Sequence, residues 1–150
     1  MTQPGLASRI IFSVVTLATA IGPMVADFNR THATNPLWTR HARFHVVWQV
    51  LTQAGVSAVI LFLVWMPGNE QMLRNWAAVA LIYVWGAAFL GTCVSMRLFD
   101  GSLHDVNGYL PFRFQIPGGG VWVVDKNALG AVNLMVIHSY GVYRLAVQGG

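Results

Sequence analysis

Long apolar stretches without formal charge constrain this 150-residue chain more than any other feature. Three of them cover residues 10–26, 46–68 and 76–96, and none contains Asp, Glu, Lys or Arg. About 20 such residues are enough for an α-helix to cross the roughly 30 Å hydrocarbon core of a bilayer. The composition agrees, because 55% of the residues are hydrophobic and only 9% are charged. The sequence therefore predicts an integral membrane protein.

A fourth apolar stretch completes an all-α, four-helix bundle. It carries Asp125 and Lys126 near its start. We expect one transmembrane domain over 1–150, with spans at about 8–27, 44–68, 74–98 and 121–147. Because consecutive spans alternate in direction, the loops after the first and third spans lie on the same side. These are the two long loops, and the Gly- and Pro-rich segment 99–120 is expected to be a loop or re-entrant lid.

The basic residues indicate which side the long loops face. Six of the nine Lys and Arg residues flank the long loops, so the positive-inside tendency places these loops in the cytoplasm. We expect the membrane to be a bacterial inner (plasma) membrane. Since these charges are spread along the membrane borders, we expect contact with lipid headgroups and no nucleic-acid partner. The six are Arg30, Arg40, Arg43, Arg97, Arg113 and Lys126.

Ionisable residues cluster between the first two apolar stretches. Segment 27–45 holds three of the five histidines, three arginines and Asp27. Ionisable groups at the edge of hydrocarbon are costly unless paired, coordinated or used, so this cluster is the candidate functional site. His41 and His45 are four residues apart and share a helix face, which we expect to point into the bundle with Trp48. An imidazole is the commonest metal ligand in proteins, and one histidine is enough to hold haem iron.

Other readings of the histidines remain open. His41 and His45 can instead be interfacial residues bonded to Asp27 or to lipid headgroups, and an ion pair with an arginine is the simplest account of Asp27. We expect His32 and His104 to be solvated loop residues, whereas a histidine deep in the fourth span, His138, is expected to be buried. Five histidines are too few for a membrane di-iron hydroxylase, and a single cysteine excludes a cysteine-based zinc site.

Two short strings connect the chain to a known family. Asn35-Pro-Leu-Trp38 ends the first loop and Ala42-Arg-Phe-His45 opens the second helix. With four short spans, these strings resemble styrene oxide isomerases, which are haem-dependent epoxide isomerases, and also an uncharacterised family of small four-helix membrane proteins. The resemblance implies a homo-oligomer, a trimer, with haem b at the subunit interface. It assigns the iron ligand to His45 and support at the helix start to Arg43; His41 and Arg40 complete the expected cofactor contacts.

The resemblance also implies a reaction. A ferric iron acts as Lewis acid on the oxygen of a small hydrophobic epoxide, and a hydride shift gives an aldehyde or ketone. The family's active-site asparagine and tyrosine fall near Leu51 and Gly91 here, so polar contacts must come from elsewhere. Trp48 is suited to stabilising a developing cation. The candidate catalytic residues are Asp27, Trp48, Tyr83 and Tyr109.

Two alternatives do without haem. In the first, the protein is a cofactor-free membrane isomerase or hydratase in which Asp27 and His45 shuttle a proton. In the second, it is a non-enzymatic accessory subunit or carrier, and the loop docks a partner or a lipid headgroup.

Overall fold

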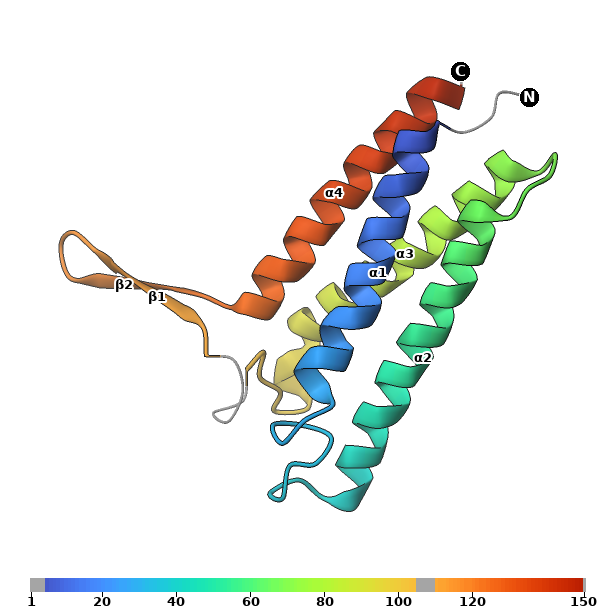
Figure 1. Cartoon of the computed structure of the whole chain (residues 1–150). Helices are drawn as coiled ribbons and strands as arrows, with labels where there is room; N and C mark the ends of the chain where they lie inside the picture. Colours follow the sequence, from blue (N-terminus) through green and yellow to red (C-terminus); the bar gives the residue numbers. More distant parts are fainter. Residues whose placement is uncertain (1–4, 105–109, 150) are drawn as a thin grey trace.

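The computed structural model describes residues 5–104 and 110–149. The segments that follow α1 and α3 lie at the same end of the helices, and the start of α1 and the end of α4 lie at the opposite end (Figure 1). This arrangement agrees with the expectation that the two long loops share one side. The helices are α1 (Leu6–Asp27), α2 (Arg40–Trp65), α3 (Gln71–Ser95) and α4 (Lys126–Gly149), with a 3₁₀ turn, η1, at Met96–Leu98.

Three helices in the described part of the chain are long and apolar enough to cross a membrane. They are α1, α2 and the continuous stretch Gln71–Leu98, which joins α3 to η1. The fourth helix, α4, is not among them, although it has 24 residues. It carries polar residues along its length, including Asn133, His138 and Arg144. The sequence therefore predicted three spanning-length helices correctly, and the fourth span stays a prediction.

The expectation of an all-α fold is wrong between α3 and α4, where the chain forms an antiparallel hairpin. Strands β1 (Phe112–Ile116) and β2 (Gly120–Val124) pair in a two-stranded sheet that projects away from the helices (Figure 1). The sequence favours strands here because Phe112-Arg-Phe-Gln-Ile116 alternates apolar and polar residues and β2 is rich in valine. Gly118 and Gly119 supply the turn, with φ angles of 104° and 96° that suit glycine.

The fourth helix consequently begins at Lys126 and not at the expected residue 121. Asp125 fixes this start, because its Oδ1 atom accepts hydrogen bonds from the backbone N–H groups of Asn127 (2.8 Å) and Ala128 (3.1 Å). Such a side-chain cap satisfies donors that have no partner within the first helical turn. Thr39 begins α2 in the same way, accepting from the Ala42 N–H at 3.1 Å.

The buried core lies toward the end of the helices that carries the short α2–α3 connection. Its residues come from the first half of α1 and α3 and from the last third of α2 and α4. The opposite end, where the long loops lie, contributes nothing to this core. The first turns of α2 are therefore left largely uncovered within one chain. The core residues are Phe12, Val15, Ile60, Val64, Ala78, Val79, Ile82 and Leu145.

A glycine allows α4 to approach α1 closely. A Cβ atom at Gly141 would lie 2.7 Å from Cγ2 of Ile11 and 2.9 Å from Cε1 of Phe12, closer than side chains normally tolerate. Small residues at such contacts are what helix packing in membranes favours. Gly130, on the same helix, has open space around it.

We therefore expect Gly141→Ala to destabilise the protein by about 1–3 kcal/mol, the usual cost of overpacking. Gly130→Ala is the matched control and is expected to be neutral or to stabilise by up to about 1 kcal/mol, since alanine favours the helix. Unfolding in mixed micelles titrated with dodecyl sulfate measures both. Equal stability of the two variants would contradict the close approach of α1 and α4.

Candidate functional site

His41 and His45 form a pair at the beginning of α2. Their Nε2 atoms are 2.9 Å apart and the rings meet edge to face, with centroids 4.4 Å apart. The two residues share a helix face as their spacing requires. This face, however, is exposed. The expectation that it points into the bundle is therefore wrong for the single chain.

The buried residues of α2 explain this orientation. Val50 is 1% exposed and belongs to the inward face of α2. At 3.6 residues per turn, the directions of His45, Trp48 and His41 differ from that of Val50 by about 140°, 160° and 180°. All three residues thus lie on the side of α2 that faces away from α1 and α3.

Two aromatic rings lie beside His45. The centroids of Phe44 and Trp48 each lie 5.8 Å from that of His45, and 6.3 Å from each other. Both side chains are more than half exposed, at 61% and 58%. We call His41, Phe44, His45 and Trp48 the α2 aromatic face. It offers an accessible imidazole beside two flat apolar rings.

The two arginines expected at this site lie differently. Arg40 is the first residue of α2 and is exposed. Arg43 differs in direction from Val50 by only about 20°, which places it on the inward side, opposite His45. Its Nε atom is buried and has no hydrogen-bond partner in the described part of the chain. Within one chain, only Arg40 is placed near the edge of the aromatic face.

Asp27 ends α1 and lies beside His32, not beside an arginine. Its Oδ1 atom is 3.6 Å from Nδ1 of His32, and each side chain is about a quarter exposed (26% and 25%). The Thr31 hydroxyl is 2.7 Å from the same Nδ1 atom. The His32 ring also meets Trp38 edge to face at 5.1 Å. His32 is thus a partly exposed loop residue, as expected, and its ring is also packed against neighbours.

Asparagine side chains hold this first loop in shape. Asn35 is 2% exposed, donates to the carbonyl of Thr31 (2.8 Å) and accepts from the N–H of Leu37 (3.0 Å). Asn29 accepts from the N–H and the hydroxyl of Thr31 at 2.8 and 2.6 Å. Such local bonds to the backbone are what asparagine provides in turns. The loop therefore presents Asp27 and His32 in a defined geometry.

The remaining candidate catalytic residues lie elsewhere. Tyr83, on α3, contacts α4: its hydroxyl is 3.1 Å from that of Ser139 and its ring lies 4.7 Å from that of His138. Tyr109 lies outside the described residues. The structure thus places Trp48 beside His45 and Asp27 beside His32. Tyr83 lies apart from both pairs, at the contact between α3 and α4. His138 is fully buried, as expected.

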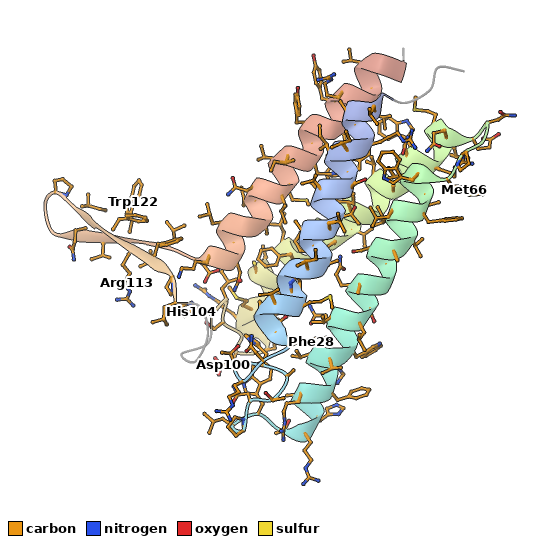
Figure 2. The ribbon with its side chains drawn as sticks, in the orientation of Figure 1. Phe28, Met66, Asp100, His104, Arg113 and Trp122 are labelled. Atoms are coloured by element: carbon orange, nitrogen blue, oxygen red, sulfur yellow. The ribbon has the colours of Figure 1, made fainter. Side chains whose placement is uncertain are left out.

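Sequence reasoning missed a histidine–carboxylate pair at the base of the hairpin. Nδ1 of His104 lies 3.5 Å from Oδ2 of Asp125, and both residues line a hollow of about 350 Å³. Figure 2 shows His104 near the start of α4, while Arg113 and Trp122 stand on the projecting hairpin. The residues are 21 positions apart, so no local spacing signals the pair. His104 is a partly exposed loop residue, as expected, and in addition it lies beside a carboxylate.

No group of three or more His, Cys, Asp or Glu side chains with metal-binding geometry occurs within residues 5–104 and 110–149. The α2 aromatic face offers two imidazoles from one chain. A single imidazole is enough to ligate a haem iron, so either of them has the chemistry to hold such a group.

Of three comparisons with known proteins, only the one with family models gives a match. No curated protein and no solved structure matches the chain. A family model described as "Family of unknown function (DUF6640)" matches residues 11–132, which include most of α1, all of α2 and α3, the hairpin and the start of α4. Since this match covers more than half of the sequence, the chain belongs to the DUF6640 family.

Proposed function

We propose that the protein is a membrane-bound isomerase that holds haem b through His45 and converts a hydrophobic epoxide to an aldehyde or ketone. The observation that carries the proposal is the α2 aromatic face, on which His45 lies beside Phe44 and Trp48 and is uncovered within its own chain. Lipid covers exposed apolar rings on a membrane helix, but it offers no hydrogen-bond partner to an imidazole, so a histidine among such rings points to a function. The string Ala42-Arg-Phe-His45 adds the resemblance to haem-dependent isomerases.

The residues of this face fit a planar macrocycle with an axial imidazole. Phe44 and Trp48 lie together beside the His45 ring and supply apolar contact, and Arg40 lies exposed at the helix start to pair with a propionate. Because the face points outward, a second copy must cover the other side of the group. The proposal therefore includes a homo-oligomer, a trimer by resemblance, with the site between subunits.

His41 restrains the ligand atom in the free chain. The 2.9 Å contact between its Nε2 and that of His45 is a hydrogen bond that iron ligation at this His45 nitrogen must break. His41 is thus a competitor for the His45 nitrogen and not a second ligand.

The surroundings of His45 suit the proposed reaction. Bound haem would supply a Lewis acid that polarises the epoxide oxygen. The Trp48 ring, next to His45, presents an electron-rich face to the positive charge that develops on the opened carbon. Apolar surroundings exclude water, which favours rearrangement over hydrolysis to a diol. The reaction needs neither oxygen nor a cosubstrate.

A direct test is turnover of styrene oxide by the haem-loaded protein in proteoliposomes. Gas chromatography is expected to show phenylacetaldehyde formed without oxygen or added cofactor. A haem-loaded protein that forms only the diol, or no product, would contradict the proposed reaction while leaving the haem site standing.

In this proposal the chain lies in the plasma membrane, with both long loops in the cytoplasm. The three spanning-length helices support membrane insertion, and the excess of Lys and Arg beside the long loops supports this orientation.

A cofactor-free isomerase is the second candidate, and the Asp27–His32 contact is the observation that favours it. The geometry changes the expected proton shuttle, because Asp27 lies beside His32 and not beside His45. A carboxylate next to an imidazole is a common general acid–base arrangement.

Asp27→Asn separates the two candidates. If haem at His45 carries the reaction, this variant is expected to keep its haem and to lose less than about tenfold in activity, because Asp27 does not touch the α2 aromatic face. Loss of about a hundredfold or more, the range of general acid–base catalysis, together with unchanged haem content would favour the Asp27–His32 pair. Initial rates and haem content are measured on the same samples.

A further inference from the structure

A groove runs between α3 and α4, on elements that carry none of the α2 aromatic face. Its volume is about 310 Å³, within the range of small-molecule sites. Gly86, Phe89 and Leu90 line it from α3, and Ala131 and Met135 belong to the α4 side. The lining is apolar apart from one hydroxyl, that of Ser139.

Polar groups gather at the Ser139 end of the groove. The hydroxyl of Tyr83 lies 3.1 Å from that of Ser139, so one donates to the other, and the pair retains one O–H donor that has no acceptor within the described residues. His138 packs edge to face against Tyr83 and is fully buried. The backbone of Val79 lies near its imidazole, but neither ring nitrogen has a hydrogen bond of good geometry in the described part of the chain.

These groups are costly in an apolar setting. A hydroxyl or imidazole without a complete set of partners loses free energy when it leaves water, and hydrocarbon offers no partner. A plain acyl chain in the groove would leave the free O–H of the Tyr83–Ser139 pair without an acceptor. An occupant that carries one oxygen at the Ser139 end satisfies it.

Gly86 and Met135 set the width of the groove. A Cβ atom at Gly86 would overlap the sulfur of Met135, so the helices touch at this position. The flexible thioether can adapt to occupants of different shape. The shape of the groove thus discriminates only weakly between occupants. The hydroxyl pair of Tyr83 and Ser139 is the part of the groove that recognises a particular chemical group.

We propose that the α3–α4 groove binds a lipophilic molecule with a single oxygen function, an alcohol or a carbonyl compound, that enters sideways from the bilayer. The Tyr83–Ser139 pair holds the oxygen and the apolar lining holds the chain. The inference rests on the proposed membrane location and is independent of haem at His45.

Photolabelling in phosphatidylcholine proteoliposomes tests this site. One probe is 1-dodecanol with a diazirine in the chain, and the other is the same chain without the hydroxyl group. Mass spectrometry is expected to find the alcohol probe on α3 and α4 peptides about five- to tenfold more often than the hydrocarbon probe, the effect of about one hydrogen bond. Equal labelling of all helices by both probes would overturn the proposal.

The double variant Tyr83→Phe with Ser139→Ala removes only two hydroxyl groups and is expected to abolish the preference for the alcohol. Tyr140→Phe is the matched control, because Tyr140 is next to Ser139 but 52% exposed and bonded to Arg144. An unchanged preference in the double variant would contradict the role of the hydroxyl pair.

A second variant, which fills the groove, tests the site independently in case the double variant does not fold. Val132→Phe adds bulk at the groove, where Val132 is 54% exposed, and is expected to reduce labelling by both probes. Haem content, measured on the same samples, is expected to stay at the wild-type value. The labelling result tests the groove proposal and the haem content tests the haem proposal, so the failure of one can be distinguished from the failure of the other.

Discussion

Replacing His45 by alanine is expected to lower haem affinity and epoxide turnover by at least about a hundredfold, because it removes the only protein ligand to the iron in the proposed site. The helix itself should persist, since His45 is exposed on α2 and alanine favours helices. Pyridine haemochrome analysis gives haem per chain, and initial rates with styrene oxide give the activity. Added imidazole is expected to restore part of both.

His41→Ala is the matched control, because it removes the same side chain one turn earlier on the same face. It is expected to keep haem at or above the wild-type content, since His45 Nε2 is then released from its 2.9 Å contact. If His41→Ala loses haem as completely as His45→Ala, the assignment of a single ligand is wrong. If neither variant loses haem, the α2 aromatic face is not the haem site.

The largest effect on stability is expected from Phe12→Ala. Phe12 is 0% exposed, belongs to the core cluster and packs against His138 with ring centroids 5.4 Å apart. Removing a buried phenyl ring typically costs about 3–5 kcal/mol, because the cavity is only partly closed by its neighbours. Much of this loss is packing, which membrane proteins rely on as soluble proteins do.

Phe62→Ala, on α2, separates packing from hydrophobicity. Phe62 is 60% exposed, so its ring meets detergent or lipid both before and after unfolding. We expect its removal to change the unfolding free energy by less than about 1 kcal/mol, as for surface substitutions. Similar losses for Phe12→Ala and Phe62→Ala in dodecyl sulfate titrations would contradict the position of the core.

The helical part of the fold was readable from the sequence because uncharged stretches of this length have few alternatives to a helix. The hairpin was missed because Val121, Trp122, Val123 and Val124 are as apolar as the start of a span. What separates them from α4 is Asp125, whose carboxylate caps the helix. Its place directly before an apolar stretch is a helix-start signal that the sequence does contain.

The candidate site was readable in its chemistry but not in its orientation. Spacing alone put His41 and His45 on one face. The direction of that face cannot be read in a helix that is apolar all round, because lipid-facing and core-facing residues have similar polarity. Contacts between distant segments, such as His104 with Asp125 and Tyr83 with Ser139, depend on how the helices pack, which local patterns do not encode.

The visible absorption spectrum of the purified wild-type protein tests the central claim most directly. Expressed with ample haem and purified in mild detergent, the protein is expected to show a strong Soret band, with pyridine haemochrome analysis giving close to one haem per proposed site. A colourless protein from the same preparation would contradict haem binding at His45 and would leave the Asp27–His32 pair as the remaining candidate for the chemistry.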